Sequence, residues 1–456
     1  MAEPLGAGTG MTAPLPSVPM DTGLWRQLAA GAAELLPWLI GLRRHFHRHP
    51  ELGWREVETT RRIVAELTKL GYETVSGRDL LGDTARLGMS STPIPGEGDT
   101  GCLALFDTGR SGPTVCLRVD IDALPIREAN ENHKPAAGGW ASEAEGVMHA
   151  CGHDGHIALG LGTARLVRPL LERGRGKLKL LFQPAEEGGR GARSVVDAGW
   201  MDDVDLFLAV HLGLGVPSGS VALDVREFLA TRKYAVALEG HPAHAGKEPE
   251  AGRNALLAAC QMVPGLHALA QSSVAGVRVN VGRLEAGTSL NIVPQFARFD
   301  FEIRAGTNEA LDDLDRRCRT FVEATAQAHE VRSVMEVRGS ADAWRNPGEM
   351  VEWAEAINRS AGVYEHTLGD YPFGASEDAT VLANAVAAQG GKAGIFVLGA
   401  DLADGHHTPH FDFDEDALAP GVHLLGALVT SALSITSQEF AGQNCSKGGE
   451  SDLGAP

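Results

Sequence analysis

The chain has 456 residues and a formal net charge of −19, with 43% hydrophobic and 22% charged residues. This length exceeds one ordinary hydrophobic core, so we expect at least two domains and a fold of enzyme size. The negative charge makes nucleic acid and anionic membrane surfaces poor partners, because both repel an acidic protein at long range. No apolar run approaches the roughly 20 residues that a membrane-spanning helix needs.

Both ends of the chain are expected to be flexible tails, over residues 1–23 and 438–456. Residues 1–25 contain no Lys or Arg and so lack the basic start of a secretory signal. The six cysteines are scattered without a Cys-x-x-Cys pair, which is typical of reduced thiols in a reducing compartment. We therefore predict a cytoplasmic protein.

The first structured segment is expected to be helical, from Leu24 to about Leu70, with breaks at Pro37 and at the His49-Pro50 step. Three histidines in it, at positions 45, 47 and 49, are interpreted as structural, because only the first and last share a helix face. Residues 81–99 indicate a surface loop. Two strands are predicted next, at 102–106 and 114–121, and we expect them to pair as a hairpin.

The densest group of metal-binding side chains lies in residues 149–156, HACGHDGH. Cys151 and His153 flank one glycine, so both side chains can converge on one ion where the backbone turns. The alternative is a histidine-rich turn that caps the following helix. This stretch alone does not separate the two interpretations, and the decision depends on ligands from elsewhere in the chain.

Polar side chains follow several predicted strands at their carboxyl ends. Strands that alternate with helices form an open α/β sheet whose ligands bind beyond the strand ends. Each of these residues alone is typical of a surface or capping position, but their common placement indicates one shared crevice. They are Asp120, Asp122, Glu186, Glu187, His211, His406 and His407, after strands predicted at 114–121, 177–182, 205–210 and 394–398.

Residues 228–338 are predicted to form an inserted α+β domain, because the order there becomes strand, helix, strand, strand, helix, strand. The flanking segments, 24–227 and 339–437, would then form one catalytic α/β domain. Polar motifs in the insertion contain His244, Asn291 and Arg304, each of which, taken alone, indicates loop or surface-strand chemistry. We expect a two-domain α/β protein with an inserted lid or dimerisation domain.

Eight motifs resemble, in order, those of a family of dinuclear-metal amidohydrolases and peptidases. This family includes hippurate hydrolases, plant auxin-conjugate hydrolases, aminoacylases and bacterial p-aminobenzoyl-glutamate hydrolase. The motifs cover most of the chain and are RRHFHRHPELGWRE, LRVDIDALPI, MHACGHDGH, LLFQPAEEGG, AVHLG, HPAHAG, GTSLNIVP and GHHTPHFDFDED. The resemblance implies hydrolysis of the amide bond of N-acyl or N-aroyl amino acids. Stretches such as DTGRSGP are most similar to the branch that cleaves p-aminobenzoyl-glutamate and indoleacetyl-aspartate, which favours an acyl-glutamate or acyl-aspartate substrate.

The resemblance also implies two divalent metal ions per subunit, either manganese or zinc. Thiolate, imidazole and carboxylate ligands suit both metals. Arg118 occupies a place where peptidase branches of the family carry a metal-binding histidine, so the chain follows the branch that uses a cysteine. The implied ligands are Cys151, His153, Glu187, His211 and His407, with the Cys151 thiolate bridging the two ions.

Roles in catalysis and substrate binding are implied in the same way. Glu186 would take a proton from a metal-held water and return it to the leaving amine. Asp120 would orient an imidazole ligand. His244 would stabilise the oxyanion from the lid of a partner subunit, which implies a homodimer. Asn291 and Arg304 resemble residues that hold the carboxylate or carbonyl of the substrate.

Arg253 and Lys247 are added from charge alone, because a protein this acidic needs local positive charge to hold a dicarboxylate. They are equally typical of a solvated lid surface. Two alternatives remain for the function: a dipeptidase or broad aminoacylase, or a protein that needs a related second subunit for activity. A structural zinc protein is disfavoured, because Glu186 provides a base beside the expected ligands.

Overall fold

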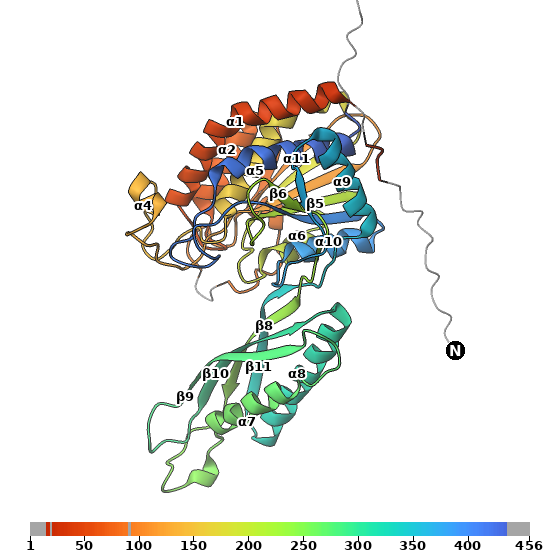
Figure 1. Ribbon diagram of the computed structural model, residues 1–456. Helices are drawn as coiled ribbons and strands as arrows, with labels where there is room; N and C mark the ends of the chain where they lie inside the picture. The colour runs from red at the N-terminus through yellow and green to blue at the C-terminus, as the bar shows by residue number, and fades with distance from the viewer. Residues whose placement is uncertain (1–14, 19–20, 90–92, 436–456) are drawn as a thin grey trace, which may run out of the picture.

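The computed structural model describes residues 15–18, 21–89 and 93–435, which form two parts (Figure 1). The larger part contains an eight-stranded sheet in the order β1-β2-β4-β3-β5-β14-β6-β12. Strands β4, β3, β5 and β14 are parallel, so their carboxyl ends meet at one edge. The strands are β1 (Glu73–Ser76), β2 (Cys102–Asp107), β3 (Thr114–Asp120), β4 (Lys177–Gln183), β5 (Leu206–Leu212), β6 (Ser220–Ala222), β12 (His366–Leu368) and β14 (Lys392–Leu398).

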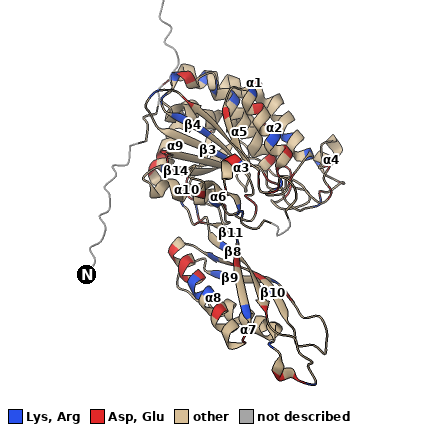
Figure 2. Ribbon diagram, turned by 180° about the vertical axis from the view of Figure 1, so that it is seen from behind, with Lys and Arg blue, Asp and Glu red and all other residues tan. Residues whose placement is uncertain are grey.

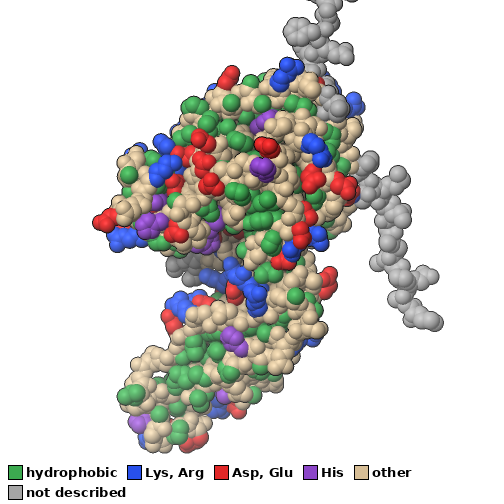
Figure 3. Space-filling view, in the orientation of Figure 1, with side chains coloured by type: hydrophobic (Ala, Val, Ile, Leu, Met, Phe, Trp, Pro, Cys, Tyr) green, Lys and Arg blue, Asp and Glu red, His purple; other side chains and the backbone are tan. Residues whose placement is uncertain are grey.

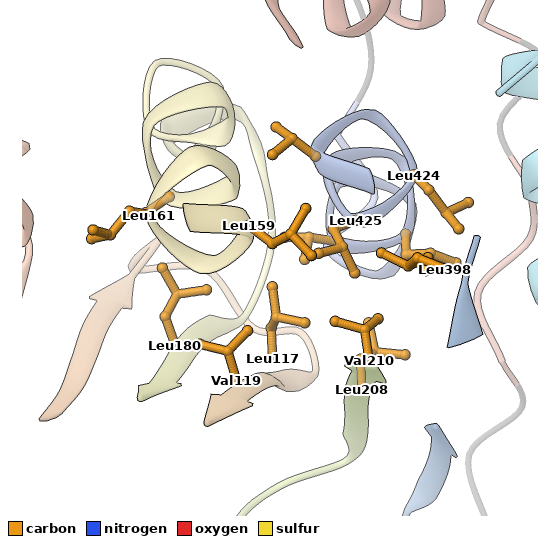
Figure 4. Close-up of a cluster of buried hydrophobic side chains, with 14 of the residues drawn as sticks. Leu117, Val119, Leu159, Leu161, Leu180, Leu208, Val210, Leu398, Leu424 and Leu425 are labelled. Atoms are coloured by element: carbon orange, nitrogen blue, oxygen red, sulfur yellow. The ribbon is translucent and has the colours of Figure 1, made fainter. Parts of the chain in front are cut away.

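Helices cover both faces of this sheet, because its strands alternate apolar side chains between the two sides. On β5, Leu208 and Val210 pack under α1, α5, α9 and α11, whereas Phe207 and Ala209 pack toward α6 and α10. Figure 4 shows the first of these cores. The helices are α1 (Thr22–Arg48), α2 (Val57–Lys69), α3 (Arg78–Leu81), α4 (Lys134–Gly138), α5 (His153–Val167), α6 (Gly191–Asp197), α9 (Gly348–Ala361), α10 (Ala379–Ala388) and α11 (Leu418–Ala432).

The smaller part is a four-stranded antiparallel sheet in the order β11-β8-β10-β9, with two helices on one face (Figure 1). Tyr234, Val236 and Leu238 of β8 are buried in its core. Its elements are β8 (Ala230–Glu239), α7 (Ala255–Ala268), β9 (Arg278–Ala286), β10 (Phe296–Ala305), α8 (Asn308–Ala328) and β11 (Arg332–Ala341). The expected α/β class with a second domain is confirmed.

Two local predictions are wrong, although the predicted break at the His49-Pro50 step is confirmed by the end of α1. Helix α1 runs unbroken through Pro37, which lies on the outer face, so the loss is limited to the one backbone hydrogen bond that its nitrogen cannot donate. Strands β2 and β3 do not form a hairpin. Strand β4 lies between them, antiparallel to β2 and parallel to β3, and local turn chemistry does not reveal that pairing.

Part of the expected N-terminal tail is packed against the larger part. The indole nitrogen of Trp353 donates to the carbonyl oxygen of Pro16 at 3.0 Å, and Leu15 and Val18 lie against the core. Residues 1–14 and 19–20, and the predicted C-terminal tail at 438–456, lie outside the described residues. Within the described ranges, no helix combines the length and the hydropathy that crossing a bilayer requires.

Candidate active site and metal centre

Side chains from both parts of the molecule line a cavity of about 330 Å³ at the carboxyl edge of the parallel strands. Figure 3 shows the hollow between the two parts. The predicted strand-end residues therefore meet, because parallel strands deliver their carboxyl ends to the same edge. Among the lining residues are Cys151, Glu186, Glu187, His211, His407 and Arg304.

Cys151 belongs to two groups of metal-binding atoms at this edge. One group joins it to His153 and Glu187, and the other joins it to His211 and His406. Within each group the ligand atoms lie within 4.8 Å of one another. The sulfur of Cys151 is thus the ligand atom that the two groups share.

Two buried ligand atoms of the first group have no hydrogen-bond partner among the described residues. They are His153 Nε2 and Glu187 Oε1. The Nδ1 atom of His153 donates to the carbonyl oxygen of Asp122 at 2.9 Å, which leaves Nε2 as its ligand atom. Gly152, with φ of +91°, lets the chain turn from the cysteine into α5. A buried unsatisfied polar atom costs about 1–3 kcal/mol, so this pair fits a bound cation.

His211 reaches the second group from the end of β5. Its Nδ1 donates to the carbonyl oxygen of Leu212 at 2.9 Å, and its Nε2 lies 3.5 Å from Cys151 Sγ. Burial, followed by the charges of His156 and His406, lowers the pKa of His211 well below its usual value. The imidazole is therefore held neutral, which is the form that binds a metal.

Two consecutive histidines reach the centre from the loop after β14, where only His407 was expected as a ligand. His407 Nε2 lies 3.4 Å from Glu187 Oε1, and its side chain is 52% exposed. His406 groups with Cys151 and His211 instead. Its Nε2 accepts from the backbone N–H of Leu214 at 3.1 Å, while its buried Nδ1 has no partner among the described residues. The sequence placed His406 in the same crevice, but only His407 was expected to be a ligand.

Asp120 and Asp122 hold the residues around the centre in place. Asp120 was expected to orient a ligand imidazole, but its Oδ1 lies 2.6 Å from Nδ1 of His156 and 3.6 Å from Nδ1 of His153. Asp122 accepts the backbone N–H groups of Glu186 and Glu187, each at 3.0 Å. Asp122 thus fixes the turn that carries Glu186 and Glu187.

Glu186 lies buried on the wall of the same cavity, one residue after Ala185, whose φ is +51°. The carboxylates of Glu377 and Asp378 approach it within 4.8 Å. Burial first, and then the charge of Glu377, raises the pKa of Glu186 well above its ordinary value. A buried carboxyl group with high proton affinity beside metal-type ligands is suited to general base catalysis. Sequence reasoning missed Glu377 and Asp378.

Arg118 is buried among these carboxylates. Its guanidinium binds Asp120 at 2.8 Å, Glu377 at 3.0 Å and Asp378 at 3.1 Å. Its Nε also donates to Gln183 at 2.8 Å. A planar cation with five donors can satisfy several buried acceptors at once, so Arg118 neutralises the acidic wall behind Glu186.

We expect Arg118→Met to lower the free energy of unfolding by about 3–5 kcal/mol, because it leaves buried carboxylates without their cation. Urea denaturation at neutral pH measures the change. The matched control is Arg127→Met, whose pair with Glu145 is exposed and should contribute nothing measurable. An Arg118 variant as stable as the wild type would contradict this role and show that the carboxylates are protonated when the cation is removed.

The remaining predicted residues of the insertion lie at the outer end of the smaller part, away from the cavity of their own chain. His244 forms an isolated bridge with Ile292, and the carbonyl oxygen of Asn291 accepts from the backbone of Ala245 at 3.0 Å. Arg253 pairs with Glu330. A single chain therefore brings only Arg304 of the predicted substrate-binding residues to the cavity.

The histidines of α1 are not among the cavity-lining residues. His47 is buried, and its two ring nitrogens lie 2.8 Å from Asp154 and 2.9 Å from Glu128. With Glu128 and His133, His47 forms a separate buried group of metal-type side chains outside the cavity. His45 and His49 line a separate surface pocket between α1 and α2.

Beyond the ends of the parallel strands, a thiol, imidazoles and a carboxylate converge beside a buried carboxyl group of raised pKa. This arrangement is typical of a hydrolase site. The chain belongs to Peptidase family M20/M25/M40, whose sequence profile matches residues 116–431. It is 40% identical over 413 residues to one of the subunits of the p-aminobenzoyl-glutamate hydrolase of Escherichia coli, covering 86% of this chain and 95% of that protein. It is 39% identical over 414 residues to the indole-3-acetyl-aspartic acid hydrolase of Enterobacter agglomerans, with coverage of 86% and 95%.

Solved structures agree with this assignment. The aminobenzoyl-glutamate utilization protein of Klebsiella pneumoniae superposes with a TM-score of 0.74 at 34% identity, covering 90% of this chain and 98% of that one. A Bacillus subtilis protein, described as a dinuclear metal binding peptidase, superposes with a TM-score of 0.65 at 26% identity, covering 88% and 99%. The chain is therefore a family hydrolase that acts on amide bonds.

Proposed function

We propose that this protein is a metal-dependent amidohydrolase that cleaves N-acyl or N-aroyl amino acids, with p-aminobenzoyl-glutamate or a similar acyl-glutamate or acyl-aspartate as substrate. One observation carries the proposal. His153 and Glu187 each have a buried ligand atom without a hydrogen-bond partner among the described residues, and the buried carboxyl group of Glu186 lies next to Glu187. The two bacterial relatives, hydrolases of p-aminobenzoyl-glutamate and of indole-3-acetyl-aspartic acid, support the substrate class.

The donor set fits two divalent ions, manganese or zinc, because it mixes thiolate, imidazole and carboxylate. A metal ion bound there would lower the pKa of a bound water molecule. The proposed ligands are those that the family resemblance implied: Cys151, His153, Glu187, His211 and His407. His406, next to His407, is a further candidate.

Glu186 carries out the proton transfers in this proposal. Its carboxylate takes the proton of the attacking water and later gives it to the nitrogen of the leaving amine. Burial supports this role, since a carboxyl group of raised pKa holds the proton between the two transfers. Asp122 keeps Glu186 in position through the backbone of its turn.

The insertion, residues 228–338, acts in this proposal as a lid and as the interface of a homodimer. His244 and Asn291 lie together at its outer end, so they can reach a catalytic cavity only in another subunit. Exposed apolar side chains surround them and suit contact with a second copy. These are Leu257, Leu284, Leu290, Ile292 and Phe296.

The test is hydrolysis of p-aminobenzoyl-glutamate by the purified chain before and after removal of metal with a chelator. We expect turnover that is lost on chelation and restored by manganese or zinc, because the ligand atoms of His153 and Glu187 make no hydrogen bond within the described residues. Release of p-aminobenzoate is followed by its absorbance, with hippurate and a dipeptide as comparison substrates. Turnover that resists chelation would contradict the proposal, and faster cleavage of the dipeptide would favour a dipeptidase.

The Escherichia coli relative is one subunit of its hydrolase, which favours a second arrangement. In it, the chain needs a related second subunit for full activity. Turnover that appears only after mixing with such a partner would support that arrangement. We place the protein in the cytoplasm, which the free thiols of the five described cysteines support.

A further inference from the structure

The open face of the smaller sheet meets the catalytic cavity at its base. On β8, Tyr234 faces the helices and binds Asp315 of α8, a helix that carries charges of both signs in Figure 2. Because side chains alternate along a strand, Thr231 and Lys233 point to the opposite, open face. Both of them line the cavity that holds the metal-type ligands.

Lys233 is held close to the turn that carries the catalytic glutamates. Its cross-strand neighbour on β11 is Gly339, and a Cβ placed there would lie 2.0 Å from the carbonyl oxygen of Gly188. The next residue, Ser340, donates its backbone N–H to Gly189 at 2.6 Å. The base of the lid thus rests directly on the backbone that follows Glu187, which fixes where the half-buried lysine enters the site.

The ammonium group of Lys233 makes no hydrogen bond or ion pair within the described part of the chain. Its neighbour on the other side is Glu302 of β10, and that carboxylate is already bound by Arg304 at 3.1 and 3.2 Å. A lysine ammonium has three donors and no acceptor, so it recruits an anion from the cavity. The cavity also carries four carboxyl groups, which would repel an anionic substrate: Glu186, Glu187, Glu377 and Asp378.

We infer that Lys233 binds the side-chain carboxylate of the acyl amino acid and so selects dicarboxylic substrates. The inference rests on the proposed function and deepens it. Two cations line the cavity, Lys233 and Arg304. Arg304 forms an ion pair with Glu302, whereas Lys233 forms no ion pair within the described residues. A substrate with a second carboxylate gains a charge-assisted bond that a neutral analogue of the same shape lacks.

The experiment compares p-aminobenzoyl-glutamate with p-aminobenzoyl-glutamine, which has the same shape without the side-chain charge. We expect Lys233→Met, in the metal-loaded protein, to lower kcat/KM for the glutamate compound about 10- to 100-fold, the range for a hydrogen bond to a charged group. Cleavage of the glutamine compound should change less than about threefold. Lys69→Met, on the surface at the end of α2, is the matched control and should leave both rates unchanged.

A binding measurement separates this inference from the proposed function. In a Glu186→Gln background, calorimetry with the same two compounds should show glutamate binding weakened by Lys233→Met and glutamine binding retained. Equal losses for both compounds would overturn the inference, because Lys233 would then only support the lid, and so would no loss at all. If the wild-type chain hydrolyses neither compound, the proposed function fails, while the calorimetric comparison still decides the role of Lys233.

Discussion

Glu186→Gln is expected to lower kcat by about 10²- to 10⁴-fold, the usual contribution of a positioned general base. Glutamine keeps the size of the side chain but cannot take a proton from water, so the loss should fall on kcat rather than on KM. The neighbouring Glu187 keeps its place, because Asp122 holds the backbone of the turn and not the side chain that is changed. Steady-state hydrolysis of p-aminobenzoyl-glutamate measures the effect.

Metal content and folding must remain intact for this loss to be assigned to proton transfer. Mass spectrometry of bound metal and thermal unfolding should therefore match the wild type. The matched control is Glu352→Gln, an exposed position on α9 that should leave kcat unchanged. A Glu186→Gln enzyme that retains a large share of wild-type kcat would show that another group takes the proton, with Glu377 and Asp378 as the neighbouring carboxyl alternatives.

Two inactive variants are expected to restore activity when they share one dimer. His244 lies at the outer end of the smaller part, outside the cavity of its own chain, so in the proposed homodimer each site would combine Glu186 of one chain with His244 of the other. In a mixed dimer of Glu186→Gln and His244→Ala chains, one of the two sites has both groups intact. Random pairing makes half of all dimers mixed, so about a quarter of wild-type activity should return in a symmetric dimer.

Coexpression of the two chains with different affinity tags isolates the mixed dimers, which should then show about half of wild-type activity, because one of their two sites is complete. Each variant alone should show at most a few per cent of wild-type turnover. The double variant Glu186→Gln/His244→Ala, coexpressed with wild type, is the control: its mixed dimers keep neither site complete and should be nearly inactive. No recovery in the first mixture would mean that His244 acts within its own chain, whereas a His244→Ala chain that is active alone would mean that His244 has no role in catalysis.

The residues of the metal centre illustrate how far local sequence leads. The sequence HACGHDGH indicates a metal site but is equally consistent with a turn that caps a helix, because two ligands close in sequence do not define a coordination geometry. The structure adds Glu187 and His211 from strands that are distant in the chain, and their convergence follows from parallel pairing. The same rule predicted the edge of the sheet at which the ligands lie.

Errors and omissions share a physical cause, which is that non-local pairing leaves little local trace. The hairpin predicted for β2 and β3 failed because β4 inserts between them. Glu377 and Asp378 precede a helix and look like ordinary capping residues in sequence, yet they lie beside Glu186 in space. His406 was placed in the crevice but not among the expected ligands, because the histidine next to it fits the family motif.

The amino-acid sequence by itself determined the α/β class, the presence of an inserted second domain and the residue types of a hydrolase site, since periodicity and clustered ligands are local properties. Tertiary structure alone decided which carboxylates surround Glu186, which cation neutralises them, and which side chains of the smaller part reach the cavity. Those relations depend on strand order and on the placement of the smaller part. Both are fixed by packing between segments far apart in the chain.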